Sequence, residues 1–487
     1  MVRGRLEDEL PTASRVIRPN ILFILIDDMG WKDVACTGSE FYETPNLDRL
    51  RGEGMLFTDA YAAAPVCSPT RASLLSGKYP ARLGVTQYIG AGEEHGKVIG
   101  APYVPYLSRD ECSVARALLE EGYRTIHVGK WHLGGPTHLP EEHGFEVNVA
   151  GSSWGAPKAG YFSPYEMPYL PDGPEGEYLT DRLTDEAIRQ IEEPDQRPWF
   201  LFLSHYAVHT PIQAPADLVA KYEAKAERLG IDQAAAIEEG DYFPLEWKKD
   251  QRLRRRKIQS DPTYAAMVEN LDANIGRLLE ALREAQVDDN TIVMFTSDNG
   301  GLSSAEGSPT CNLPLREGKG WMYEGGTREP LLVKWPGVVA PGSKCDTPVT
   351  TPDFYPTILE MAGAQARPEQ HCDGESLLPL LEENGYLERE DIFWHFPHYG
   401  NQGGTPGSSI RHKEWKLIEF YEDGRLELYH LTRDPGETNN LVAEEPERTR
   451  RLHERLRAWR EQLEALEPKP NPDFVPWREE DIRNALE

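Results

Sequence analysis

The 487-residue chain lacks the long apolar segment that a transmembrane helix requires. Its longest apolar run covers residues 21–26, whereas a helix needs about 20 apolar residues to cross the hydrocarbon layer of a bilayer. Residues 1–7 also lack the apolar stretch of a secretory signal. We therefore expect no membrane association and a cytoplasmic location, or a periplasmic or secreted location if a leader has been removed.

The chain also lacks paired cysteines. Its six cysteines are scattered, and none belongs to a Cys-x-x-Cys pair. This spacing fits neither a zinc site nor a dense disulfide framework, although one structural disulfide stays open.

Positive charge is scarce as well. The 52 basic and 81 acidic residues give a net charge of −29, which argues against nucleic acid as a partner. An anionic substrate would need a locally basic pocket. One basic run, residues 252–257, interrupts a polar insert at 221–260. We interpret it as a solvated helix face or loop, with a patch that grips a polyanion as the alternative.

Four apolar runs indicate the fold of the N-terminal part. Their continuous hydrophobicity is typical of strands that are buried on both faces of a parallel sheet. Helical patterns lie between them, with apolar residues at three- and four-residue spacing in 264–282. Strands that alternate with helices predict an α/β fold whose large, mostly parallel sheet is flanked by helices. The predicted strands are 21–26, 125–128, 199–203 and 291–295.

The pattern changes near residue 391. Two alternating segments, 415–421 and 425–429, flank Glu422-Asp423-Gly424, which is a good hairpin signal. A helix with a leucine stripe from Leu452 to Leu466 follows. We predict a smaller C-terminal α+β domain with a short antiparallel sheet. The predicted units are an N-terminal extension at 1–18, a catalytic domain at 19–385 and a C-terminal α+β subdomain at 386–487.

Polar side chains follow each predicted strand directly. Asp27 and Asp28 come after the first run, and Asp298 and Asn299 come after the fourth. Ligands in open α/β sheets bind at the carboxyl ends of the strands, so these oxygens are expected to meet. Carboxylate and amide oxygens suit Ca²⁺ or Mg²⁺ better than zinc. The alternative is that these residues only cap turns.

The other two strands lead into cationic and imidazole side chains. Lys130 and His132 follow the second run, and His209 follows the third. Lys319 lies between glycines further along the chain. Taken alone, a residue like His209 is more often a packed histidine, and one like Lys319 is more often an exposed loop residue. They indicate a functional site only because they are expected to converge with the other polar residues.

Cys67 is predicted to stand where a loop meets a helix. Pro69 suits the first helical turn, and Gly77 is a typical residue for ending the helix. A helix N-terminus favours anions, and Arg71 projects from the same turn. The alternative for Cys67 is a buried, inert small side chain.

Taken together, these motifs resemble those of type I sulfatases, in the alkaline phosphatase superfamily. The order and rough spacing match over most of residues 19–385, and more weakly beyond. The resemblance implies an alkaline phosphatase-like fold and a sulfate-ester hydrolase. The motifs are Asp27-Asp28, Cys67-x-Pro69-x-Arg71, Gly129-Lys130-Trp131-His132-Leu133-Gly134, His209-Thr210-Pro211, Asp298-Asn299-Gly300 and Gly318-Lys319-Gly320.

The resemblance also implies a cofactor and a metal. A separate maturation enzyme would oxidise Cys67 to formylglycine, whose hydrate is the nucleophile. Ca²⁺, with Mg²⁺ as the alternative, would lower the pKa of the hydrate. The implied metal ligands are Asp27, Asp28, Asp298, Asn299 and the matured residue 67.

The remaining roles follow from the same resemblance. Arg71 would steady the hydrate, and Lys130 and Lys319 would bind the sulfate. His209 would protonate the leaving alcohol oxygen. His132 would help to remove a proton from the second hydroxyl, so that sulfate leaves and the aldehyde is restored.

The substrate is implied by segments 393–399 and 401–406, which resemble those of bacterial carbohydrate sulfatases. They predict a loop at the pocket rim, with interdomain packing as the alternative, and a galactose or N-acetylgalactosamine 4-sulfate as substrate. The candidate substrate-binding residues are His395, His398 and Trp154. Two other functions stay open: a phosphoester or phosphonate hydrolase, and a sugar-binding protein with unoxidised Cys67. No sequence feature indicates an oligomeric state.

Overall fold

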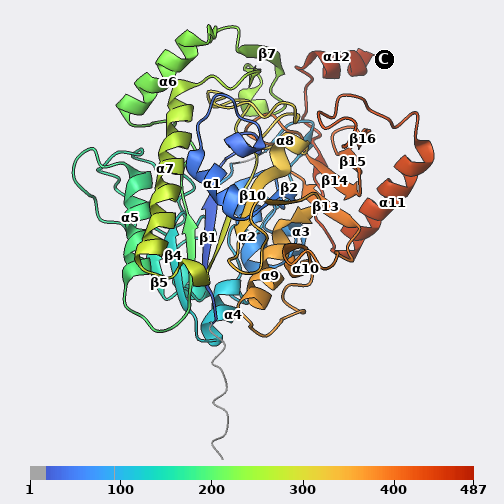
Figure 1. Ribbon diagram of the computed structural model, residues 1–487. Coiled ribbons are helices and arrows are strands. Elements are labelled where there is room, and N and C mark those ends of the chain that lie inside the picture. Colours follow the sequence, from blue (N-terminus) through green and yellow to red (C-terminus); the bar gives the residue numbers. More distant parts are fainter. Residues whose placement is uncertain (1–17, 93, 487) are drawn as a thin grey trace, which may run out of the picture.

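A computed structural model describes residues 18–92 and 94–486, and Figure 1 shows its arrangement. The predicted N-terminal extension therefore lies outside the described residues, except for Arg18. Within the described part, no helix is both long and apolar enough to span a bilayer.

A nine-stranded sheet forms the centre of the molecule. Its order is β11-β2-β10-β9-β1-β6-β4-β5, with β12 also paired to β2. Only β10 runs antiparallel to its neighbours, and the other described pairings of this sheet are parallel. The predicted α/β fold with a mostly parallel sheet is confirmed. The strands are β1 (Asn20–Ile26), β2 (Met55–Tyr61), β4 (Arg124–Gly129), β5 (Val147–Val149), β6 (Trp199–Ser204), β9 (Thr291–Ser297), β10 (Arg328–Lys334), β11 (Ser343–Cys345) and β12 (Val349–Thr350).

Helices cover both faces of this sheet. Alternate residues of β1 explain why: Ile24 belongs to one hydrophobic core and Phe23 to the core on the opposite face. Burying each such side chain contributes about 1.5–3 kcal/mol, so a continuous apolar strand is stable only between two layers. The first core is closed by α1 (Pro45–Glu53), α5 (Leu179–Glu192), α6 (Ala216–Arg228) and α7 (Pro262–Glu284), and the second by α2 (Cys67–Ser76), α4 (Val114–Glu120), α9 (Phe354–Met361) and α10 (Leu378–Leu381).

A separate four-stranded antiparallel sheet lies beside the main sheet (Figure 1). Its strands are β13 (Asp391–Phe396), β14 (Gly407–His412), β15 (Trp415–Phe420) and β16 (Leu426–His430), and α11 (Pro446–Gln462) packs against it. The predicted hairpin is β15–β16. Because α11 ends at Gln462, Leu466 lies beyond it, and the predicted stripe is longer than the helix.

The polar insert corrects one interpretation. Its basic run is neither a helix face nor a loop but a strand, β8 (Arg252–Arg256), paired with β7 (Ile237–Tyr242) in a two-stranded sheet. The question of a disulfide is also answered, since all six cysteines lie among the described residues and are free.

Candidate active site

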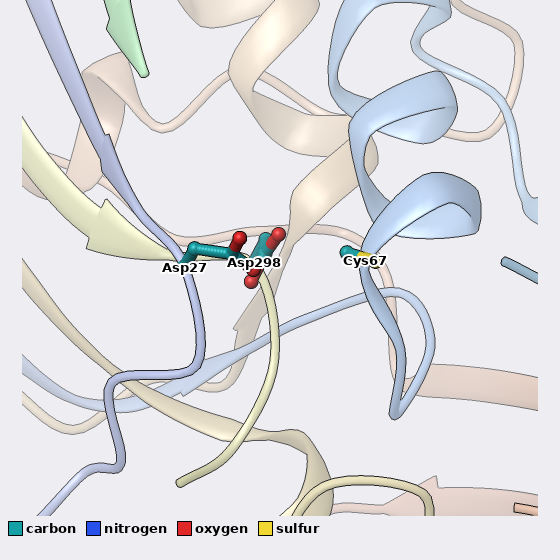
Figure 2. A group of neighbouring side chains, drawn as sticks. All are labelled: Asp27, Cys67 and Asp298. Atoms are coloured by element: carbon teal, nitrogen blue, oxygen red, sulfur yellow. The ribbon is translucent and has the colours of Figure 1, made fainter. Parts of the chain in front are cut away.

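The predicted catalytic and metal-binding residues meet at one edge of the central sheet. The carboxyl ends of β1, β4 and β9 lead into Asp27, Lys130 and Asp298, and β2 leads to Cys67 at the start of α2. Figure 2 shows Asp27, Asp298 and Cys67 as neighbours. Parallel pairing produces this convergence, because it brings strand ends that are distant in sequence to the same edge.

Cys67 occupies the first turn of α2, as predicted. Val66 before it is extended, and Gly77 ends the helix with a left-handed φ of 69°. The Cys67 side chain is buried, and its Sγ lies 3.3 Å from His132 Nδ1. Burial raises the pKa of the Cys67 thiol, so the unmodified group is protonated and a poor nucleophile.

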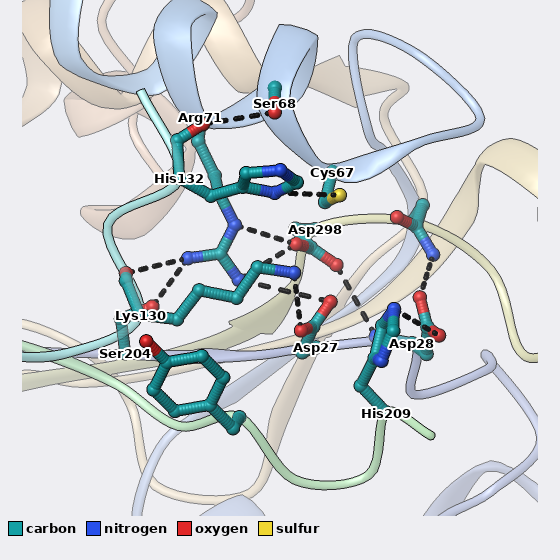
Figure 3. Close-up of polar contacts among 12 residues, drawn as sticks. Asp27, Asp28, Cys67, Ser68, Arg71, Lys130, His132, Ser204, His209 and Asp298 are labelled. Atoms are coloured by element: carbon teal, nitrogen blue, oxygen red, sulfur yellow. Dashed lines mark hydrogen bonds and ion pairs between the residues drawn. The ribbon is translucent and has the colours of Figure 1, made fainter. Parts of the chain in front are cut away.

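Arg71 holds several strand ends together from within α2 (Figure 3). Its Nε and Nη2 lie 2.8 and 2.7 Å from Asp298 Oδ2. Its Nη1 donates to the Lys130 carbonyl oxygen at 3.0 Å and to Ser204 Oγ at 2.5 Å. A buried guanidinium with these partners fixes the orientation of Asp298.

Two lysines neutralise the remaining carboxylates. Lys130 Nζ lies 2.6 Å from Asp27 Oδ2, and Lys319 Nζ lies 2.8 Å from Asp28 Oδ2. Burial opposes ionisation of Asp28, but the charges of Lys319 and His209 outweigh it and lower the pKa of Asp28. Lys319 shows the matching change, since Asp28 outweighs burial and raises its pKa.

The oxygen atoms fit a divalent cation. Asp27 Oδ1 and Asn299 Oδ1 are buried without a hydrogen-bond partner among the described residues, and such an atom costs about 1–3 kcal/mol. One ligand atom each from Asp27, Cys67 and Asp298 lies within 4.8 Å of the others. Hard oxygens in this number suit Ca²⁺ or Mg²⁺, so the residues present fit the predicted metal.

The two histidines present different nitrogens to the site. His132 Nε2 donates to the Ile89 carbonyl at 2.8 Å, because a carbonyl only accepts, and Nδ1 is left with a lone pair toward Cys67. Burial lowers the pKa of His132 well below its usual value. His209 Nδ1 donates to the Thr210 carbonyl at 2.8 Å, and its Nε2 lies 3.7 Å from Asp28 Oδ2. Burial and then Lys319 lower the pKa of His209 to about 3.

These groups open into a pocket of about 270 Å³. The predicted residues Cys67, His132, His209 and Lys319 line it. Thr210 belongs to the motif that contains His209, but most of the rest of the wall was not predicted, because it comes from loops without a chemical motif. Only Asn401 and Gln402 lay in a segment that had been singled out for the rim. The further lining residues are Val66, Tyr88, Ile89, Gly155, Ala156, Thr210 and Glu306.

Two of the candidate substrate-binding residues are elsewhere. His395 is buried between Ser408 Oγ, at 2.7 Å, and the Leu466 carbonyl, at 2.9 Å. His398 is buried between Thr86 Oγ1, at 2.8 Å, and Glu94 Oε2, at 3.2 Å. Neither lines the pocket, which corrects the prediction for both, because their ring nitrogens already have partners within the protein.

Trp154, the third candidate substrate-binding residue, lies next to the pocket wall. It directly precedes Gly155 and Ala156 of the pocket wall, is partly buried, and has Lys158 Nζ 4.5 Å from its ring centre. It does not itself line the cavity, and its contact with substrate stays a prediction.

Comparison with known proteins agrees with this geometry. The sulfatase family model matches residues 19–364, and the N-sulphoglucosamine sulphohydrolase C-terminal model matches 318–462. A sulfatase of Formosa agariphila is 35% identical over 91% of this chain and 88% of its own length. Human N-acetylgalactosamine-6-sulfatase is 30% identical over 93% of this chain and 88% of its own. The crystal structure of Ps i-CgsB in complex with k-i-k-neocarrahexaose has a TM-score of 0.73 and 28% identity, covering 91% of this chain and 93% of that chain.

The chain therefore belongs to the sulfatase family and is a sulfuric ester hydrolase. The predicted family, the enzyme class and the alkaline phosphatase-like fold with its smaller antiparallel domain are confirmed.

Proposed function

We propose that this protein removes sulfate from a carbohydrate, using a formylglycine made from Cys67 and a Ca²⁺ held by Asp27, Asp28, Asp298 and Asn299. Two relatives support a sugar substrate: one is named for N-acetylgalactosamine 6-sulfate, and the solved structure contains neocarrahexaose. We propose galactose or N-acetylgalactosamine as the sugar, with O4 and O6 as the sulfate positions to compare.

One observation carries this proposal. Cys67 shares a buried cluster with three carboxylates and three cationic side chains, and the cluster opens into a pocket. The thiol itself is not activated, since burial raises its pKa. Once matured and hydrated, residue 67 would supply a hydroxyl that attacks sulfur and a second hydroxyl that later expels sulfate.

The histidines and Lys319 are arranged for proton movement on two sides of sulfur. His132 Nδ1 has a lone pair directed at position 67, so it accepts a proton from the group there. Lys319 lines the pocket and holds its proton at neutral pH because Asp28 raises its pKa. Lys319 therefore supplies the proton that the leaving sugar oxygen takes up. His209 is neutral, with its proton on Nδ1, so its Nε2 would share this role only after taking up a proton, which the negative charge of a bound sulfate would favour.

The metal would also change what the lysines do. Lys130 and Lys319 contact Asp27 and Asp28. Ca²⁺ bound to these carboxylates would take over the neutralisation of their charge. The two ammonium groups would then be available to the sulfate oxygens, so metal and substrate are expected to bind cooperatively.

Peptide mass spectrometry across Cys67 tests the nucleophile first. The protein is produced in a host that contains the maturation enzyme, together with a sulfatase known to be matured there. The proposal expects the mass of formylglycine at position 67. An unmodified thiol beside a matured control would contradict it and favour a sugar-binding protein.

Substrate assays then test the reaction. Galactose and N-acetylgalactosamine sulfated at O4 or O6 are compared with phosphate esters of the same sugars, with Ca²⁺ present. The proposal expects kcat/KM to be higher for sulfate esters. Faster turnover of the phosphate esters would favour phosphoester hydrolysis, and efficient turnover of another sulfated sugar alone would refute the assignment of the sugar.

A further inference from the structure

We propose that strand β8 builds a second anion-binding site beside the active-site pocket, which holds a sulfate or carboxylate on a neighbouring sugar unit of the same saccharide. This inference rests on the proposed function, since it assumes a saccharide in the catalytic pocket. It extends that function by predicting an anionic oligosaccharide as the preferred substrate.

The site is a cavity of its own. It measures about 260 Å³, and its cationic lining residues are Lys248, Arg252, Arg254 and Arg256. Glu306 lines both this cavity and the active-site pocket. The two cavities therefore share one wall.

The strand periodicity places the arginines on the cavity side. Successive strand residues point to opposite faces, so Arg252, Arg254 and Arg256 share one face of β8 and Arg255 belongs to the other. Lys257 directly follows the strand. Arg255 and Lys257 are already paired with acidic side chains. Arg255 Nε lies 2.9 Å from Glu317 Oε1, and Lys257 forms an ion pair with Glu238.

Glu306 is the one acidic residue among the described residues that line this cavity, against four cationic ones. Arg254 and Arg252 form no ion pair with any carboxylate that the structure describes, and Arg252 only donates to the Gly240 carbonyl and lies over the Tyr242 ring. Arg256, by contrast, lies 3.4 Å from Asp261 Oδ2. In a chain with a net charge of −29, unpaired cations around one cavity favour an anionic ligand.

Lys248 supports the same conclusion. Only 8% of its surface is exposed, and its Nζ donates to the Asn401 carbonyl at 2.7 Å. No described carboxylate lies within ion-pair distance of it. A buried ammonium without a counter-ion is costly, and an anion in the cavity would supply one.

The backbone connects this site rigidly to the active site. The Ala305 amide donates to the Arg254 carbonyl at 3.2 Å, and the Arg256 amide donates to the Ser303 carbonyl at 3.0 Å. The next residue in the loop, Glu306, accepts from Gln402 Nε2 at 3.2 Å. Its carboxylate separates the two cation-lined cavities, so it repels an anion between them and accepts hydrogen bonds from sugar hydroxyls.

The test compares two substrates with three variants. The substrates are N-acetylgalactosamine 6-sulfate and a chondroitin 6-sulfate tetrasaccharide, and the variants are Arg254→Gln, Arg252→Gln/Arg254→Gln and the control Lys257→Gln. An exposed ion pair contributes up to about fivefold in affinity. We expect kcat/KM on the tetrasaccharide to fall about fivefold for Arg254→Gln and about 25-fold for the double variant. Turnover of the monosaccharide should change less than about twofold.

The control removes the same charge from Lys257, which directly follows β8 and is already paired with Glu238. Equal effects of Lys257→Gln and Arg254→Gln on the tetrasaccharide would overturn the proposal, as would equal losses on both substrates. A carrageenan tetrasaccharide, whose anionic groups are all sulfates, distinguishes a site for sulfate from one that requires carboxylate.

A binding measurement keeps the two proposals separate. Calorimetry with unmatured protein, which still has the Cys67 thiol, needs no catalysis. Weaker tetrasaccharide binding by the double variant supports the second site even if the wild type hydrolyses no sugar sulfate, a result that would refute the proposed function alone. Unchanged binding would refute the second site.

Discussion

Replacement of Lys319 by methionine tests how the carboxylate cluster is neutralised. Methionine retains most of the length of lysine but removes the ammonium group, which lies 2.8 Å from Asp28 Oδ2. Asp28 would keep one strong donor, Asn299 Nδ2 at 2.8 Å. Breaking a buried ion pair on one side costs about 3–5 kcal/mol, so we expect Lys319→Met to lower the free energy of unfolding by about this amount without metal.

Ca²⁺ should remove most of this difference. A ligand at 100 times its dissociation constant stabilises the folded state by about 2.7 kcal/mol. In the variant, Ca²⁺ does not compete with an ammonium group for Asp28, so it should bind more tightly and stabilise the variant more than the wild type. We expect Lys319→Met to lower the Tm by about 3–5 °C in chelator, because the entropy of unfolding of a 487-residue chain makes each kcal/mol worth about 1 °C. In saturating Ca²⁺ the loss should be less than half as large.

Differential scanning fluorimetry of both proteins, in chelator and in Ca²⁺, measures this effect. Lys334→Met is the matched control, since Lys334 Nζ lies 2.7 Å from Glu53 Oε2, outside the site. Its Tm loss should be the same in both buffers. If Lys319→Met also loses the same Tm with and without Ca²⁺, the metal does not bind at Asp28 and the reasoning is refuted.

Three further predictions concern separate parts of the molecule. Cys67→Ser should lower kcat at least about 10³-fold while leaving the Tm nearly unchanged; retained turnover would contradict the role of a matured cysteine. Burial lowers the pKa of His395 from 6.5 to about 3, so the unfolded chain binds one more proton between these pH values. The stability that neutral His395 contributes is complete above pH 6.5 and is lost by about 1.4 kcal/mol per pH unit as the pH falls. His395→Gln should remove one proton from the uptake on unfolding, so the free energy of unfolding should fall less steeply as the pH is lowered. KM should stay unchanged; a raised KM would show that His395 contacts the substrate. Gly77→Ala should lower the Tm, because its Cβ would lie 2.5 Å from His371 Cβ at a positive φ; an unchanged Tm would mean that α2 ends differently.

Much of the fold and of the catalytic cluster could be predicted from the sequence because local and global signals agree there. Asp27, Lys130 and Asp298 each follow an apolar run, and parallel pairing leaves those strand ends only one common edge. The start of α2 was equally local, since Pro69 and Gly77 mark its first turn and its end. Each prediction needed only a pattern within about ten residues and a general property of parallel sheets.

The surroundings of the cluster depended on contacts that no local pattern specifies. His398 lies in a promising segment, yet Thr86 and Glu94, which are distant in sequence, satisfy both of its ring nitrogens. Glu306 enters the pocket wall because the Ala305 amide pairs with β8. The basic run was likewise predicted to be a helix face or loop, because its pairing with β7 cannot be recognised from the local sequence.

The sequence by itself determined the family, the mostly parallel sheet between two layers of helices, and the identity of the residues that converge on Cys67. Hydrophobic periodicity and the polar residues at strand ends are properties of short segments, so they can be recognised without knowing which segments pack against them. The tertiary structure decided which polar side chains stay free. A histidine becomes a packing residue once both of its nitrogens have partners, as in His395. An arginine remains available to a ligand when no acid is placed opposite it, as in Arg254. That difference depends on which distant segments fold against each residue.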